Sequence, residues 1–123
     1  MQRETTNTPL QALTLLNDPQ FVEAGRVFAE RILLELVDAA DRDRVSLAFE
    51  TVTSRLPRND ELEELVKALK EQRVYFERNE EAALAVLGVG EAMRSGSVDV
   101  ADHAAFSVIA NLIFNLSEAV TKG

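Results

Sequence analysis

The amino-acid sequence predicts an all-α protein, a compact orthogonal or bundle-like array of about six helices around one core. Three observations predict this fold class. Apolar residues recur at three- and four-residue spacing along almost the whole chain, and no stretch shows sustained period-two alternation. Residues that favour helix caps stand where several of these stretches begin. Glycine and proline are scarce, five and three of 123 residues, so few positions interrupt a helix.

The first predicted helix begins at Thr8, whose side chain can cap it. Pro9 suits the first helical position, and Gln11 completes a Thr-x-x-Gln capping box. The apolar stripe of this helix would consist of Leu10, Leu13 and Leu16. The run Asn17-Asp18-Pro19 then ends it and begins the next helix, which predicts a tight corner between the two.

The second predicted helix runs from about Pro19 to Val37. Its core-facing band would consist of Phe21, Val22, Gly25, Phe28, Ala29, Ile32, Leu33 and Leu36. Gly25 in a helix interior costs about 1 kcal/mol relative to alanine. A close crossing of two helices at Gly25 would explain why glycine stands there.

The third and fourth predicted helices follow. Asp41 is expected to cap the third, whose inner face would be Val45, Ala48, Phe49 and Val52. The fourth covers about Asp60 to Arg78, with acidic residues in its first turn and basic residues toward its end, as the helix dipole favours. Its apolar stripe would be Leu62, Leu65, Val66, Leu69 and Phe76.

Two further helices complete the expected core. A short helix covers Glu80 to Leu87, and the glycine-rich segment Gly88 to Asp99 reads as a loop. Asp99 would cap the last helix, about Val100 to Ser117. Its inward residues would be Ala105, Val108, Ile109, Leu112, Ile113 and Leu116. With no internal repeat or domain boundary, residues 1–123 are predicted to form a single helical domain.

Composition and charge exclude several kinds of function. A formal net charge of -8 opposes binding to nucleic acid and to anionic membranes. The absence of cysteine excludes thiol catalysis, thiolate zinc and c-type haem attachment within this chain, and a single histidine excludes a multi-histidine metal site. The longest apolar run, Val108 to Phe114, is broken by Asn111 and is too short to insert directly into a membrane.

No motif predicts catalysis. His103 could pair with Asp99 or Asp102 as an acid and base, but a structural histidine is the preferred interpretation. The acidic run Asp60 to Glu64 lacks the turning, glycine-containing backbone of a calcium loop. The sequence therefore predicts no catalytic, cofactor-binding or metal-ligating residue, and no cofactor in this chain.

The polar residues before the first helix form the candidate interaction or docking site. This segment is rich in hydrogen-bonding side chains, and the leucines of the short helix after it cover more than one face. The residues singled out are Arg3, Thr6, Asn7, Thr8, Leu10 and Leu15. The expected partner is the preceding part of a longer polypeptide, or a second copy in a weak homodimer.

Arg3 and the run Thr6–Ala24, TNTPLQALTLLNDPQFVEA, resemble the C-terminal domain of unknown function of planctomycete-type multi-domain cytochrome c proteins. Further similarity spans nearly the whole chain. It includes Ala48-Phe49, Arg55-Leu56-Pro57, Leu87–Glu91, Ala104-Ala105-Phe106 and Leu112–Glu118. The departures are Ser54 for a usual Gly, Arg58 for a capping Thr, Phe106 for Trp and Ala119 for Phe. The change at residue 58 leaves Asn59 as an alternative start of the fourth helix.

The resemblance implies that the chain is the C-terminal part of an exported protein, located in the periplasm or otherwise outside the cytoplasm, with a haem-binding region upstream. It carries no catalytic residue over to this sequence. Two hypotheses remain open. The chain is either a non-catalytic structural and interaction module, or part of the active-site wall of an enzyme acting on polysaccharide whose catalytic groups lie upstream. A cleft with two facing carboxylates would favour the second hypothesis.

Overall fold

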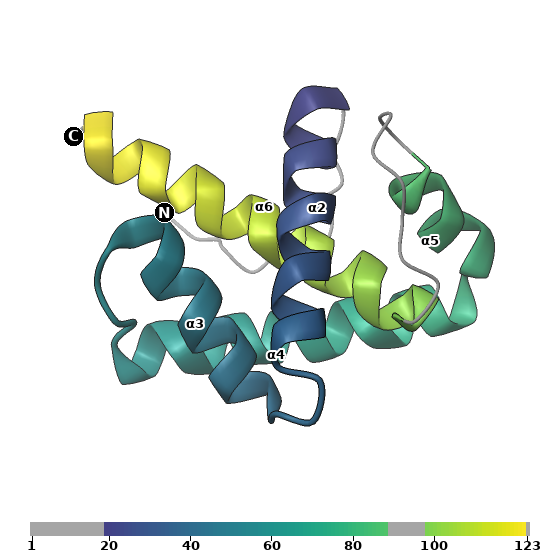
Figure 1. The fold of residues 1–123 in the computed structure, drawn as a ribbon, viewed down its shortest axis with the longest axis horizontal. Helices are drawn as coiled ribbons and strands as arrows, with labels where there is room; N and C mark the ends of the chain where they lie inside the picture. Colours follow the sequence, from purple (N-terminus) through teal and green to yellow (C-terminus); the bar gives the residue numbers. More distant parts are fainter. Residues whose placement is uncertain (1–18, 89–97, 123) are drawn as a thin grey trace, which may run out of the picture.

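The computed structural model describes residues 19–88 and 98–122, and these residues form five helices and no strand. The helices are α2 (Pro19–Glu35), α3 (Asp41–Thr53), α4 (Asn59–Arg78), α5 (Glu80–Leu87) and α6 (Val100–Lys122). Figure 1 shows them packed as crossing helices. The all-α fold class is therefore confirmed. The first predicted helix, which begins at Thr8, lies outside the described residues.

Helix α6 is the central element of the fold. It contacts each of the other four described helices, and in Figure 1 it crosses behind α2. Every residue from 103 to 111 is buried. A helix that is enclosed on all sides needs apolar or small residues all round, and the run AAFSVIA over residues 104–110 supplies them.

The apolar stripes predicted for α3 and α4 face the core. On α3 the buried residues are Val45, Ala48 and Phe49. On α4 they are Leu62, Leu65, Ala68, Leu69, Gln72 and Phe76. Two residues expected on these stripes, Val52 and Val66, are only half-buried. Val66 instead lines a groove between the two helices.

Helix α2 ends at Glu35, two residues before the predicted end at Val37. Arg44 on α3 accounts for this boundary. Its Nε donates a hydrogen bond to the carbonyl of Leu36 at 2.9 Å, and its Nη2 donates to the carbonyl of Val37. An arginine side chain thus satisfies carbonyls at the helix end. Leu36, expected in the core-facing band, lies in the turn and is half-buried.

The sequence prediction that Asp41 caps α3 is wrong. Asp41 is the first helical residue, and Ala40 holds the N-cap position without a side-chain hydrogen bond. The Asp41 carboxylate instead accepts two hydrogen bonds from Arg73 on α4. Its charge still complements the dipole in the first turn.

Ser54 lies in the turn between α3 and α4, where the resemblance implies a usual glycine. Ser54 has a φ of 67°, in the left-handed region, and its N–H bonds to the carbonyl of Glu50 at 2.8 Å. Glycine adopts this conformation without the strain that a Cβ introduces. A serine at this position is therefore more strained than a glycine would be.

Helix α4 begins at Asn59, the alternative start. The Glu61 carboxylate accepts the N–H of Arg58 at 2.8 Å and two hydrogen bonds from the Arg55 guanidinium, each at 3.0 Å. These donors favour the charged carboxylate, and they lower the pKa of Glu61 from 4.5 to about 2, with Arg55 as the larger cause. Arg55 also lies 4.8 Å above the ring centroid of Phe49.

Helix α6 continues to Lys122, beyond the predicted end at Ser117. The Asp99 cap is confirmed, since its Oδ2 accepts the N–H of Asp102 at 3.0 Å. Leu116 was expected to face inward, but 46% of it is exposed. Phe114 of α6 packs against Phe28 of α2, with ring centroids 5.6 Å apart. In Figure 1 the C-terminal end of α6 extends beyond α2.

Candidate functional site

The six residues predicted as a docking site precede the first described helix. Arg3, Thr6, Asn7, Thr8, Leu10 and Leu15 all lie outside the described residues. Their role therefore stays a prediction. The polar features that the structure does describe are a buried cluster between α2 and α6, an ion-pair network joining α3, α4 and α6, and two surface hollows.

The buried cluster is centred on His103, which is 0% exposed. Its Nε2 lies 2.9 Å from the backbone carbonyl oxygen of Arg26 on α2. Because a carbonyl only accepts, Nε2 must carry the proton and donate. The structural interpretation of His103 is thus confirmed, because this hydrogen bond joins two helices in the core.

Ser107 lies one turn beyond His103, a Ser–His pairing that sequence reasoning overlooked. The pair is not arranged for nucleophilic catalysis. Ser107 Oγ donates to the backbone carbonyl of His103 at 2.8 Å and not to its ring, and both residues are buried. A nucleophile must be hydrogen-bonded to its base and accessible to substrate. Asn111 continues the series, since its Nδ2 donates to the carbonyl of Ser107 at 2.9 Å.

Arg26 is the largest polar side chain of this cluster and is only 1% exposed. Its Nη2 lies 3.9 Å from Oε2 of Glu23, one turn earlier on α2. Charged side chains are rarely buried so fully unless they are paired. No local pattern predicts this burial, because nothing next to Arg26 in the sequence distinguishes it from the other charged residues of α2.

The second polar feature is a network around Arg73 of α4. Its guanidinium donates two hydrogen bonds to Asp41 of α3, at 2.8 and 3.1 Å, and one to Asp102 of α6, at 2.6 Å. The hydrogen bonds from Arg73 lower the pKa of Asp41, and the same contact with Asp41 raises the pKa of Arg73. These charged groups therefore serve to hold three helices together.

The bonds of Asp102 and Asp99 bear on the acid–base pairing proposed for His103. Asp102 bonds to Arg73, and Asp99 caps α6. His103 is directed toward α2. The two carboxylates that the sequence offered as partners of the histidine are thus used elsewhere.

One surface hollow carries three carboxylates and bears on the polysaccharide hypothesis. It has a volume of about 310 Å³ and is lined by Phe76, Glu77, Glu80, Asp99, Val100 and Ala101. All three acidic side chains are exposed, and that of Asp99 is occupied as a helix cap. A glycosidase acid is kept protonated by an apolar surrounding, which this hollow does not provide.

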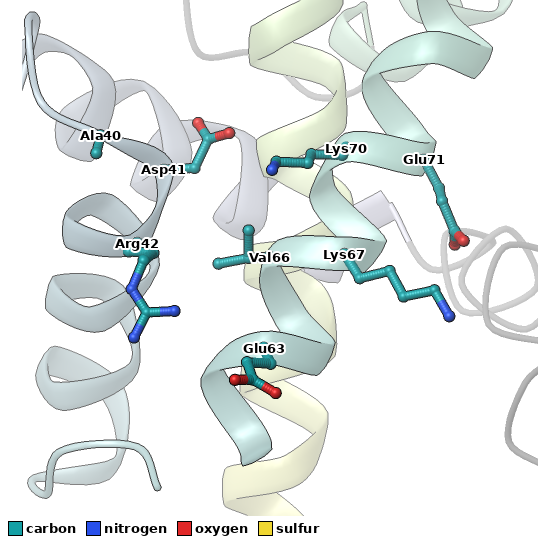
Figure 2. Close-up of a pocket in the computed structure, with 8 residues that line it drawn as sticks. All are labelled: Ala40, Asp41, Arg42, Glu63, Val66, Lys67, Lys70 and Glu71. Atoms are coloured by element: carbon teal, nitrogen blue, oxygen red, sulfur yellow. The ribbon is translucent and has the colours of Figure 1, made fainter. Parts of the chain in front are cut away.

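The other hollow is a groove between α3 and α4, with a volume of about 580 Å³. Figure 2 shows Val66 directed into it from α4, with Asp41 and Arg42 on the opposite wall. Its lining consists of Ala40, Asp41, Arg42, Glu63, Val66, Lys67, Lys70 and Glu71. The sequence did not reveal this groove, because its two walls are more than twenty residues apart along the chain.

Two findings concern metals and membranes. Within residues 19–88 and 98–122, no group of three or more His, Cys, Asp or Glu side chains is placed to hold a metal ion. Asp60 and Glu61 of the acidic run instead pair with Arg58 and Arg55. Across the same part of the chain, no helix has the length and apolar character needed to cross a bilayer.

Comparison with known proteins places the first part of the chain in a family. No curated protein matches the sequence, and no solved structure matches the chain. Residues 1–69, more than half of the chain, match the family PSD1, described as a protein of unknown function (DUF1553). This range includes the TNTPLQAL run and the turn at Ser54. The chain therefore belongs to the DUF1553 family of uncharacterised proteins.

Proposed function

We propose that the chain is a non-catalytic helical module that completes a larger, exported, haem-associated polypeptide by packing against its preceding part. The resemblance to cytochrome c-associated domains supports the context, and the family to which the chain belongs is itself uncharacterised. His103 and Arg73 bond to other helices, and Ser107 bonds to the backbone of its own helix, which supports a structural role.

One observation carries the proposal: α2 is apolar on two opposite sides. Its inner side packs on α6 through Ala29, Ile32 and Leu33, all buried. Its outer side presents Val27 and Leu34, which are 41% and 44% exposed. These two residues are seven positions apart and so lie on one face, two turns from each other. We name Val27 and Leu34 the outer α2 pair.

The outer α2 pair lies on the helix that directly follows the predicted docking segment in the sequence. Arg31 stands between them on the same exposed side. Arginine is enriched in protein interfaces, and apolar contacts dominate their buried centre, so these three residues suit an interface between parts of a protein. The proposed partner is the remainder of the parent polypeptide.

A binding experiment tests this function. The 123-residue chain and the separately produced remainder of its parent polypeptide are mixed, and association is measured by sedimentation velocity. The double variant Val27→Asp/Leu34→Asp should weaken association at least tenfold. Val74→Asp is the matched control, because Val74 is exposed to a similar degree on α4. Association of the double variant at wild-type strength would contradict the proposal.

The haem context has an independent test. If the parent polypeptide carries covalently bound haem, the purified full-length protein should show a Soret band that persists after denaturation. The 123-residue chain should show none, because it has no cysteine to hold haem. If the full-length protein contained no haem, the proposed haem association would be wrong. The proposed packing role of α2 would not be affected, because the binding experiment tests it separately.

A further inference from the structure

The groove between α3 and α4 contains two basic side chains that form no ion pair with a described acidic side chain. Within the described part of the chain, Arg42 and Lys70 form no ion pair. Figure 2 shows Lys70 reaching from α4 across the groove toward Asp41, and Arg42 hanging along the opposite wall. The methyl groups of Val66 lie between these two cations. A chain with net charge -8 thus holds two free cations over one apolar surface.

The acidic residue closest to this arrangement is already neutralised. Both carboxylate oxygens of Asp41 accept hydrogen bonds from Arg73. Lys70 and Arg44 lie near enough to act on Asp41 electrostatically, but Arg44 uses its donors on two backbone carbonyls and so keeps its charge unmatched. The positive charges at this end of the groove therefore exceed the negative ones.

Glu63 limits what the groove can accept. It lies one turn before Val66 on the same wall and has no ion pair in the described part of the chain. Its charge would repel a ligand that carries more than one negative charge. Lys67 and Glu71, although counted among the lining residues, point away from α3 in Figure 2. In Figure 2, Lys70 and Arg42 therefore lie on either side of the apolar surface of Val66, and Glu63 adds a negative charge on the α4 wall.

We propose that this groove binds a small organic monoanion, with its oxyanion held between Lys70 and Arg42 and its apolar body against Val66. The volume of about 580 Å³ lies within the range of small-molecule sites. Charge-assisted hydrogen bonds from two cations supply orientation, and the apolar middle of the groove supplies affinity for the body. The site is distinct from the outer α2 pair and does not depend on the proposed packing role.

The test uses naphthalene-2-carboxylate as the probe, titrated into the ¹⁵N-labelled 123-residue chain and followed by amide chemical shifts. We expect saturable shifts at Ala40 to Arg42 and at Val66 to Lys70. The uncharged analogue naphthalene-2-methanol and the dianion naphthalene-2,6-dicarboxylate should each bind at least tenfold more weakly. Shifts spread over the whole protein, or equal affinity for the uncharged analogue, would overturn the proposal.

Variants assign the binding to the two cations. Lys70→Gln and Arg42→Gln should each raise the dissociation constant of the carboxylate about tenfold, since each removes one charged donor. Arg78→Gln is the matched control on the same helix and should leave the dissociation constant unchanged, because Arg78 does not line the groove. All three positions are exposed, so the variants should fold. Equal binding by wild type and Lys70→Gln, or equal loss in Arg78→Gln, would contradict the assignment.

Discussion

Gly25 of α2 and Asn111 of α6 approach so closely that a Cβ at residue 25 would lie 2.5 Å from Nδ2 of Asn111. Real side chains do not tolerate that distance. Asn111 cannot move away freely, because it is 1% exposed and its Nδ2 donates to the carbonyl of Ser107. This contact confirms the prediction that Gly25 marks a close helix crossing, and it explains why a costly residue stands within α2.

Gly25→Ala should therefore lower the free energy of unfolding, although alanine is the better helix former. Overpacking costs about 1–3 kcal/mol, whereas the gain in helix propensity is about 1 kcal/mol. Urea denaturation measures the difference. In an Asn111→Ala background the clash is absent, so the same substitution should stabilise the protein by about 1 kcal/mol. The same sign in both backgrounds would mean that the two helices cross elsewhere.

Ser54→Gly should raise the free energy of unfolding by about 1 kcal/mol, because it removes the strain of a left-handed serine. The matched control is Glu50→Gly, at an exposed position inside α3. There glycine should cost about 1 kcal/mol. Thermal or urea denaturation compares the two variants. If Ser54→Gly destabilises as much as the control does, residue 54 does not have a positive φ.

Glu61 should make stability depend on acid pH. Its pKa is 4.5 in the unfolded chain and about 2 in the fold, so between these values the unfolded state binds more protons. The stabilisation is therefore complete above about pH 4.5 and is lost as the pH falls toward 2. Glu61→Gln should show a flatter profile of unfolding free energy against pH. Profiles that remain parallel down to pH 2 would exclude this role.

Arg73→Met should destabilise the protein by about 1–3 kcal/mol, because it leaves the half-buried carboxylates of Asp41 and Asp102 without their shared donor. Arg58→Met provides the comparison. Arg58 pairs with Asp60 on the open surface, where ion pairs contribute about 0–1 kcal/mol. Equal losses for the two variants in urea denaturation would show that the Arg73 network holds no helices together.

Local signals in the sequence predicted most of the helix positions. The limits of α5 and the Asp99 cap depend on residues within one or two turns. The sequence also predicted a close crossing at Gly25, because glycine is costly inside a helix, but it did not indicate that Asn111 of α6 is the partner. Caps and apolar spacing report such local arrangements directly. Where a neighbouring helix decided the outcome, the prediction was wrong, as for Asp41 and the end of α2.

The polar contacts of the fold could not be predicted in the same way. Arg73 meets its two carboxylates across 29 and 32 residues of sequence, and no local pattern indicates which arginine does so. The burial of Arg26 likewise depends on where α6 lies against α2. The groove over Val66 exists only once α3 and α4 are placed side by side. The predicted docking residues, from Arg3 to Leu15, lie outside the described residues and stay a prediction.

The most direct test of the central claim, that the outer side of α2 packs against the rest of the parent polypeptide, is cysteine labelling. The chain has no cysteine, so Val27→Cys and Leu34→Cys each introduce one thiol, and mass spectrometry can follow its reaction with a maleimide. Leu84→Cys, at an exposed position of α5, is the control. The account predicts that residues 27 and 34 react at least tenfold more slowly in the full-length polypeptide than in the 123-residue chain, while residue 84 reacts equally fast in both. Equal rates at residues 27 and 34 in the two proteins would contradict it.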